Sequence, residues 1–239
     1  MMTTKSTIVD LKEEPRDNLI SLYISAYSGH PWHEQFECGN CGVTYSDGCE
    51  KNAACEEFVK RDSLYLKKGK FCGNCGEELE KCLKPMWTKE VVNKDFEDAL
   101  NQECFIGNGI KSDKDLVGFF WGFKMPKKDT HHVWYEKASK ILEAKSIDPN
   151  KTFYHTEIGI KPSAQGKGLG KDLLFNSLKE VSKEFNVIVY RTINPVVNHL
   201  YSAILSKEAN PLFRDPNPAK DQSWYAFDIK HLKEKEGLK

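Results

Sequence analysis

The stretch Gln165-Gly166-Lys167-Gly168-Leu169-Gly170 decides the fold of this 239-residue chain. It joins an apolar strand, expected over 153–160, to an amphipathic helix that opens near Lys171. Glycines let a backbone come close to an anion, and the first N–H groups of a helix add partial positive charge. The stretch therefore predicts a cradle for a pyrophosphate group.

Two common phosphate-binding motifs do not fit this spacing. A Walker loop requires G-x-x-x-x-G-K-[ST], whereas Lys171 is followed by Asp172, which has no hydroxyl for magnesium. A dinucleotide-binding fold places its glycines early in a domain and an acidic residue at the end of the next strand. Here the glycines come late, and the next strand, expected over 187–193, has no terminal acid.

What remains is the pattern Q/R-x-x-G-x-G/A after a strand that ends in Ile-x-Pro, an ending that Ile160-Lys161-Pro162 supplies. This pattern resembles the acyl-CoA motif of the GNAT acetyltransferase superfamily. Downstream, Asn194-Pro195-Val196-Val197-Asn198-His199-Leu200-Tyr201 is similar to the family's N-x-x-A-x-x-L-Y segment, with Val197 replacing Ala. Upstream, Pro31-Trp32-His33-Glu34 resembles a segment near the first helix of some members.

The resemblance implies an α+β fold with a GNAT-type mixed, mostly antiparallel sheet flanked by helices. It also implies an N-acetyltransferase that takes its acetyl group from acetyl-CoA. The pantetheine arm would pair with backbone groups of the strand, and the pyrophosphate would lie over the glycine turn. The residues implied in binding acetyl-CoA are Ile158, Ile160, Gln165, Gly166, Lys167, Gly168, Leu169, Gly170, Lys171 and Asn194.

Acyl transfer to an amine needs a neutral nucleophile, a polarised thioester carbonyl and a proton for the leaving thiolate. Tyr201 takes the position from which the family commonly protonates the CoA thiolate. A backbone N–H on the strand 153–160 can polarise the carbonyl. The Gly-Phe pair that usually follows the tyrosine is absent, so the last strands are expected to begin near Leu212.

The identity of the general base is open. Many relatives carry Glu eleven residues before the Gln165 position, where this chain has Tyr154. Glu157 is a carboxylate of suitable type and is our preferred base, with Glu34 and His155 as alternatives. Strict alternation along a strand would put Glu157 and Tyr154 on opposite faces, unless a bulge resets the phase.

Cysteine spacing predicts a metal site. Seven of the eight cysteines fall between Cys38 and Cys82, in a pattern with two near-identical C-G-N-C-G knuckles. Four thiolates suit tetrahedral zinc, so we expect one structural zinc on Cys38, Cys41, Cys72 and Cys75. The other four, Cys49, Cys55, Cys82 and Cys104, are interpreted as free or buried thiols. A second metal on Cys49, Cys55 and Cys82 would need a further His or carboxylate ligand.

These patterns divide the chain into three segments. Residues 1–36 are expected to form the N-terminal part of a GNAT domain, 37–84 a zinc-ribbon-like insertion between its first two helices, and 85–239 the remainder. An additional insertion, 126–151, carries one more expected helix of unassigned role. Whether the ribbon shapes the acceptor cleft or faces away from it is open, because zinc ribbons serve either purpose.

Composition narrows the class of partner. Lys plus Arg and Asp plus Glu are equal at 35 each, so no overall field favours nucleic acid or an anionic membrane. No apolar run approaches a membrane span, and residues 1–12 lack the apolar core of a signal peptide. We expect a cytoplasmic enzyme that acts on an amine-bearing small molecule, peptide or protein, with its oligomeric state open.

A second hypothesis makes the ribbon a binding module for protein or nucleic acid, joined to a CoA-sensing or targeting GNAT half. A local basic stretch favours it: Lys60, Arg61, Lys67, Lys68 and Lys70. Acidic residues flank this stretch and weaken its field.

Overall fold

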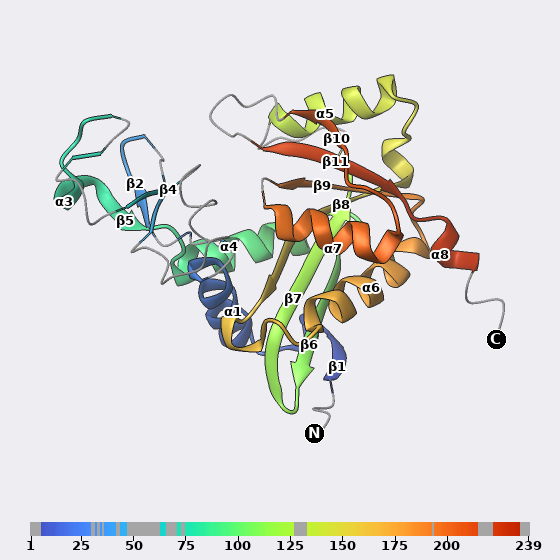
Figure 1. The fold of residues 1–239 in the computed structure, drawn as a ribbon, viewed down its shortest axis with the longest axis horizontal. Coiled ribbons are helices and arrows are strands. Elements are labelled where there is room, and N and C mark those ends of the chain that lie inside the picture. The colour runs from blue at the N-terminus through green and yellow to red at the C-terminus, as the bar shows by residue number, and fades with distance from the viewer. Residues whose placement is uncertain are drawn as a thin grey trace.

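The computed structural model of the chain describes residues 6–29, 32, 34, 36–41, 44–46, 63–65, 71, 72, 75–126, 133–192, 194–214 and 222–234. Its strands form two sheets, one of seven strands and one of four (Figure 1). Helices cover both faces of the larger sheet (Figure 1). The candidate metal ligands belong to the region of the smaller sheet, and the glycine stretch belongs to the larger one.

The larger sheet has the strand order β1-β6-β7-β8-β9-β11-β10. Every neighbouring pair is antiparallel except β8 and β9, which run parallel. The prediction of a mixed, mostly antiparallel sheet flanked by helices is therefore confirmed. Its strands are β1 (Ser6–Asp10), β6 (Ile106–Ser112), β7 (Asp115–Lys124), β8 (Thr152–Ile160), β9 (Val187–Thr192), β10 (Pro211–Arg214) and β11 (Ser223–Asp228).

The central strand β7 shows why helices are needed on both faces. Phe119 and Trp121 point into one buried cluster, whereas Val117 and Phe120 point into another. A strand that is apolar on both sides is stable only where both sides are covered. The first cluster lies under α1 (Arg16–Ser28), α4 (Lys89–Leu100) and α5 (Val133–Ala144), and the second under α6 (Leu169–Ser182), α7 (Pro195–Leu205) and α8 (His231–Glu234).

One predicted helix differs from expectation in its start. The helix expected to open near Lys171 is α6, which begins two residues earlier, within the glycine stretch, and ends at Ser182. It begins early because Gly168 takes the N-cap position with a φ of 82°, a conformation that glycine adopts without strain. In the insertion 126–151 the expected extra helix is confirmed as α5. Among the described helices, none is long and apolar enough to cross a membrane.

The smaller sheet is formed by the part of the chain between α1 and α4. It lies beside these two helices, on the side away from the larger sheet (Figure 1). Each of its strands has only three residues. They are β2 (Phe36–Cys38), β3 (Thr44–Ser46), β4 (Ser63–Tyr65) and β5 (Leu83–Pro85), with the short helix α3 (Leu79–Cys82) before β5. Cys49, Cys55 and the basic stretch from Lys60 to Lys70, except for its residues 63–65, lie outside the described residues.

Strand β8 contains a bulge where it faces β7. Trp121 pairs with Glu157 and Gly122 pairs with His155, so Thr156 has no counterpart. The Thr156 hydroxyl instead donates to the Trp121 carbonyl at 3.2 Å. The bulge shifts the phase of alternation, so Tyr154 and Glu157 both lie on the α1 side of the sheet. The expectation from strict alternation is therefore wrong.

Strands β8 and β9 separate just before this bulge. Their pairing runs from Thr152 to His155 on β8 and stops there. Lys161 donates its N–H to the Val117 carbonyl of β7, and the backbone groups of consecutive residues in a strand point in opposite directions. The backbone groups of Ile158 and Ile160 therefore point away from β7, into the gap between β8 and β9.

Gly122 is required by the bulge, which yields a test of the fold. A Cβ on Gly122 would lie 2.2 Å from the Tyr154 carbonyl oxygen and 2.9 Å from the His155 Cα, and neither backbone atom can rotate away. We expect Gly122→Ala to lower the free energy of unfolding by about 1–3 kcal/mol, as overpacking does. Urea unfolding followed by circular dichroism measures it.

Gly170→Ala is the matched control for this experiment. A Cβ at Gly170 would make only ordinary contacts, 3.5 Å from Ile160 and 3.8 Å from Leu200, inside helix α6. Alanine is the better helix former, so this variant should be as stable as the parent or slightly more stable. Equal stability of the Gly122→Ala variant and the parent would contradict the described bulge.

Candidate functional site

A cleft of about 390 Å³ opens where β8 and β9 separate. The start of α6 forms one wall, α7 contributes Val197 and Leu200, and Trp32 closes another side. Eight of the ten residues that the sequence assigned to acetyl-CoA line this cleft. They are Ile158, Ile160, Gln165, Gly166, Gly168, Leu169, Gly170 and Lys171.

The glycine turn has the geometry of an anion cradle. Gly166 and Gly168 have φ angles of 73° and 82°, and a Cβ on either would meet no atom within 4 Å. Glycine is thus favoured by the backbone conformation, and the space that a side chain would fill stays open for a ligand. The turn leads into the positive end of the α6 dipole. An apolar cleft ending at such a turn fits a pantetheine arm joined to a pyrophosphate.

Two assigned residues do not line the cleft. Lys167 is exposed, and its ammonium group donates to the Ser163 carbonyl at 3.2 Å. Asn194 is fully buried and caps α7 by accepting a hydrogen bond from the Val196 N–H at 2.9 Å. Asn194 therefore supports the cleft by fixing the helix that carries Val197 and Leu200.

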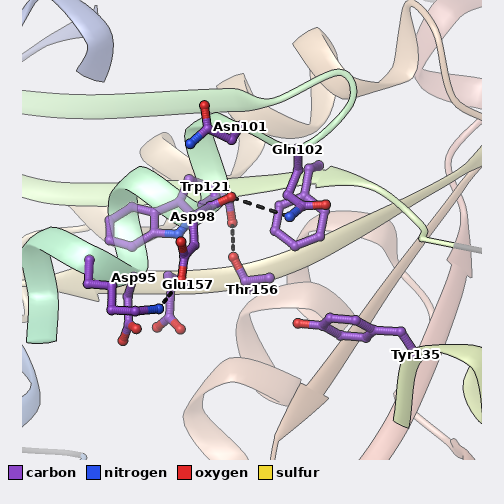
Figure 2. A pocket seen from close by; sticks show the side chains of 11 residues that line it. Asp95, Asp98, Asn101, Gln102, Trp121, Tyr135, Thr156 and Glu157 are labelled. Atoms are coloured by element: carbon purple, nitrogen blue, oxygen red, sulfur yellow. Dashed lines mark hydrogen bonds and ion pairs between the residues drawn. The ribbon is translucent and has the colours of Figure 1, made fainter. Parts of the chain in front are cut away.

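A second pocket, of about 620 Å³, lies on the α1 and α4 side of β8. Its wall combines carboxyl groups of α4, Asp95 and Asp98, with the Trp121 ring of β7 and with Glu157 (Figure 2). Asp98 is paired with Lys94 at 2.6 Å. Tyr135 of α5 completes the lining, which gives the insertion 126–151 a place in the site (Figure 2).

Glu157 has the electrostatic character of a general base. Burial raises the pKa of its carboxyl to about 8, and the nearby charges of Glu34 and Asp95 add to the rise. A hydrogen bond from the Tyr27 hydroxyl opposes it by stabilising the carboxylate. A carboxyl with a pKa near neutral can accept a proton from an amine during attack.

The alternative bases are less suitable. Burial lowers the pKa of His155 to about 3, so its ring is neutral and a weak proton acceptor. One ring nitrogen, Nδ1, already lies 2.8 Å from the Tyr201 hydroxyl. Glu34 donates its backbone N–H to the Tyr27 carbonyl at 2.8 Å and is not among the lining residues of either pocket.

Tyr201 is fully buried and is not among the residues that line the cleft, although its neighbour Leu200 is. Its ring stacks on Tyr190 with centroids 4.1 Å apart, and its hydroxyl contacts His155, the last β8 residue paired with β9. Burial raises the pKa of the Tyr201 phenol well above its usual value, so the phenol stays protonated. It is thus held as a proton donor at the point where the two strands separate.

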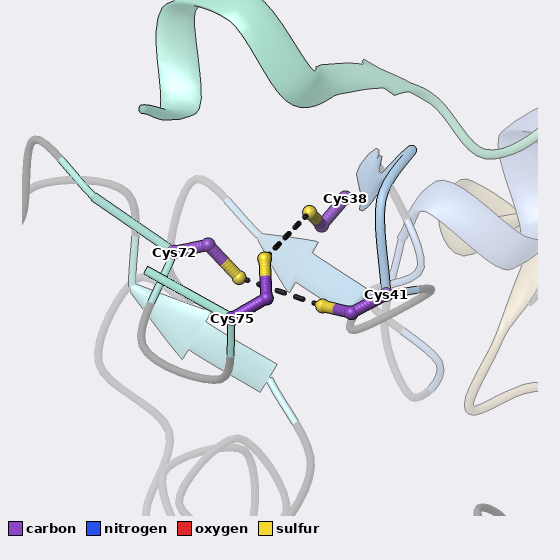
Figure 3. Close-up of side chains that lie close together, drawn as sticks. All are labelled: Cys38, Cys41, Cys72 and Cys75. Carbon is purple, nitrogen blue, oxygen red and sulfur yellow. Dashed lines mark hydrogen bonds between the residues drawn. The ribbon is translucent and has the colours of Figure 1, made fainter. Parts of the chain in front are cut away.

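The four knuckle cysteines come together in the smaller sheet (Figure 3). All four Sγ atoms lie within 4.8 Å of one another, with Cys38 to Cys75 at 3.7 Å and Cys41 to Cys72 at 3.6 Å. A tetrahedral zinc with bonds of about 2.3 Å needs sulfurs about 3.8 Å apart. The donor set and its spacing therefore fit zinc.

Comparison with known families identifies the larger sheet and its helices. Residues 74–203 match the sequence profile of the acetyltransferase (GNAT) family. The chain belongs to the GNAT family. GNAT proteins are acyltransferases that use acetyl-CoA, so the chain is an acyltransferase of this class. Comparison with curated protein sequences finds no significant match.

Solved structures with similar folds are distant in sequence. PH1933 from Pyrococcus horikoshii is 13% identical and aligns over 94% of this chain and 98% of its own, with a TM-score of 0.51. PaiA N-acetyltransferase from Thermoplasma acidophilum, solved with coenzyme A, is 13% identical over 94% and 99%, with a TM-score of 0.49. The ribosomal-protein-S18-alanine N-acetyltransferase from Escherichia coli is 12% identical over 94% of both chains, with a TM-score of 0.46. The likeness to PH1933 concerns the fold alone.

Several residues that line the pockets or contact Glu157 could not be assigned from this GNAT sequence. Tyr27 lies at helical spacing from Tyr23 and was indistinguishable from an ordinary core residue of the first helix. Trp121 and Tyr135 belong to apolar stretches with no motif of their own. Asp95 and Asp98 both lie in the second half of α4, and their three-residue spacing is the only sequence signal for an acidic wall.

The cysteine geometry predicts one tightly held zinc per chain. Elemental analysis of protein purified without added metal should find about one zinc, and Cys72→Ser should lose it because three thiolates remain. Cys104→Ser is the matched control, since Cys104 is exposed and lies outside the cluster. Negligible zinc in the parent, or undiminished zinc in Cys72→Ser, would contradict the assignment.

The glycine geometry predicts that CoA stabilises this protein through the turn. A ligand that binds only the native state adds about 2.7 kcal/mol at a hundredfold excess over its Kd. Gly168→Val should abolish the thermal shift with CoA, because Val disfavours a φ of 82° and fills the open cradle. Each protein is compared with itself without CoA. An unchanged shift in the variant would mean that CoA binds elsewhere.

Proposed function

We propose that this chain is an N-acetyltransferase that moves an acetyl group from acetyl-CoA to a primary amine by direct attack in a ternary complex. The supporting observation is that two pockets meet at the bulge of β8. Thr156 and Glu157 line the larger pocket, and the next residue, Ile158, lines the cleft. An acceptor and a cofactor in these pockets would approach each other past β8, through the gap where β8 and β9 separate.

The larger pocket is the proposed acceptor site. Its carboxyl groups attract a cationic amine, and its Trp121 and Tyr135 rings favour cations as well. Glu157 is the proposed general base, because its raised pKa and its place in the lining let it take the ammonium proton. Nothing in this chemistry selects between a small molecule, a peptide and a protein, so the acceptor class stays that broad.

The cleft is the proposed cofactor site, where acetyl-CoA would supply the thioester. The residues for it are the eight that line the cleft, with Lys167 at the edge of the turn and Asn194 behind it as the cap of α7. The N–H of Ile158 points into the gap and is suited to polarise a carbonyl there. Tyr201 is the proposed acid, which gives its phenolic proton to the departing thiolate.

Zinc is proposed as a structural ion on Cys38, Cys41, Cys72 and Cys75. All four positions are thiolates, so no ligand position is open for catalysis. The segment bounds 1–36, 37–84 and 85–239, the cytoplasmic location and the absence of nucleic-acid and membrane partners stay predictions. The binding-module hypothesis rested on the basic stretch, most of which lies outside the described residues.

The proposed function is tested by incubating the protein with acetyl-CoA and a panel of amines, and by following thiol release and the acetylated product. The panel should include small monoamines, diamines, and peptides with free N-termini or lysines. An acetylated amine supports the proposal. Binding of CoA without any acetylated product, together with tight peptide or nucleic-acid binding, would favour the CoA-sensing alternative.

The raised pKa of Glu157 predicts the pH dependence. The base must be ionised, so kcat/KM should rise as pH increases through about 8 and then level off. The groups that set this pKa are Tyr27 and Tyr23 from α1, Glu34 after it, and Asp95 from α4. The experiment uses two amines with different pKa values. A rise in kcat/KM that is due to Glu157 keeps the same midpoint pH with both amines, whereas a rise that is due to the substrate moves with the amine. This rise is called the Glu157 limb of the pH profile.

Glu157→Gln keeps the side-chain shape but cannot accept the proton. It should lower kcat/KM by about 10²–10⁴-fold and remove the limb near pH 8. A variant that retains both the rate and the limb would show that another group is the base.

Tyr201→Phe keeps the ring and its packing but removes the proton. It should leave CoA affinity unchanged and lower turnover by about 10²–10⁴-fold, the range for a positioned general acid. Thiol release under saturating acceptor measures turnover, and calorimetry with CoA measures affinity. Full turnover in this variant would leave Tyr201 with a packing role only.

A further inference from the structure

The segment from β2 to β5, which carries the four-cysteine cluster, is called the cysteine module. The residues on either side of it contact one side chain of α1, Tyr27. Trp32 precedes β2, and Trp87 follows β5. The Tyr27 ring contacts both, with centroid distances of 5.1 Å to Trp32 and 5.4 Å to Trp87. The chain thus enters and leaves the module through two tryptophans that contact the same tyrosine.

Between the tryptophans and the cysteine cluster lies a short paired stem. Strands β2 and β5 pair from Phe36 with Pro85 to Cys38 with Leu83. At the cluster end, Cys38 is one of the four ligands, and the Gly39 N–H donates to the Cys82 carbonyl at 2.7 Å. Strands of three residues bury little apolar surface and are marginal by themselves. A metal that fixes Cys38 against Cys72 and Cys75 therefore also fixes the stem.

Tyr27 continues this connection into both pockets. Its hydroxyl donates to the Glu157 carboxyl in the larger pocket. The residue that follows Glu157 in β8, Ile158, lines the cleft. Trp32 is itself a wall of that cleft. The side chains at the base of the stem thus contact the proposed cofactor site and hold the proposed base.

We propose that the four-cysteine cluster controls the acetyl-transfer site through Tyr27. Metal binding holds the β2–β5 stem in register, the stem presses Trp32 and Trp87 onto Tyr27, and Tyr27 positions Glu157 and the adjoining wall of the cleft. Tyr27 is a positioning residue, since it acts through Glu157. The effect on Glu157 rests on the proposed function, whereas the effect on the cleft is measurable from CoA binding alone.

The first experiment compares CoA affinity, by calorimetry, in the zinc-loaded full chain, in the chain stripped of zinc by a chelator, and in Cys72→Ser. Zinc content is measured for each sample. We expect zinc removal to weaken CoA binding by about fivefold or more, a coupling typical of contacting groups, and added zinc to restore it. Cys104→Ser, with its exposed cysteine outside the cluster, should behave as the parent.

A second variant keeps the test decisive if the zinc-free chain unfolds. Trp87→Leu breaks the contact with Tyr27 while leaving all four cysteines in place, and Trp87 is not among the residues that line the cleft. In the zinc-loaded protein it should bind one zinc yet bind CoA several-fold more weakly. When Cys72→Ser is added to the Trp87→Leu variant, it should weaken CoA binding by a smaller factor than it does in the parent.

Tyr27→Phe separates positioning from packing. The ring contacts remain, so CoA affinity should stay within about twofold, whereas kcat should fall and the limb assigned to Glu157 should move to higher pH. CoA affinity that is unchanged in Trp87→Leu, and in the zinc-free chain where that chain stays folded, would overturn the proposal. Failure of the zinc-loaded parent to bind CoA would instead overturn the proposed function.

Discussion

The single unpaired residue in β8 is the constraint on which the rest of the site depends. Because Thr156 has no partner on β7, Glu157 turns to the same face as Tyr154 and enters the pocket under α1 and α4. The same irregularity follows directly on the last β8–β9 pair, His155 with Tyr190, and beyond it the backbone N–H groups of Ile158 and Ile160 point away from β7 into the gap between β8 and β9. One extra residue thus brings the proposed base, Glu157, to one pocket and the backbone edge of β8 to the other. Gly122 permits it, since any side chain there would collide with the Tyr154 carbonyl.

The sequence predicted the parts of this arrangement that are encoded locally. The glycine turn, the Ile-x-Pro ending and the helix after them are contiguous, so backbone preferences alone indicate a cradle at 165–171. The knuckle spacing likewise identified the four cysteines that come within 4.8 Å of one another. The face of Glu157 could not be predicted, because a bulge depends on what the neighbouring strand offers, and Gly122 is 35 residues away. Tyr27, Trp121 and Tyr135 were missed for a related reason: their roles come from packing between distant segments.

Burial raises the pKa values of the Glu157 carboxyl and of the Tyr201 phenol above those that the groups have in water. The Glu157 carboxyl keeps its proton to near pH 8, and the Tyr201 phenol keeps its proton at all ordinary pH values. One group is therefore adjusted to exchange a proton near neutrality, and the other is held as a donor. The four-cysteine module lies outside this chemistry but is joined to it by the aromatic contacts of Tyr27, Trp32 and Trp87. The proposed zinc site and the proposed reaction centre are thereby connected through contacting side chains.

The central claim is that the backbone edge of β8 beyond its bulge receives the cofactor. Amide hydrogen exchange, resolved by residue with and without saturating CoA, tests it directly. We predict that CoA slows exchange at Ile158 and Ile160 by at least about tenfold, while the amides of Thr152 to His155, already paired within the sheet, change little. Unchanged exchange at Ile158 and Ile160 in the CoA-saturated protein would contradict it.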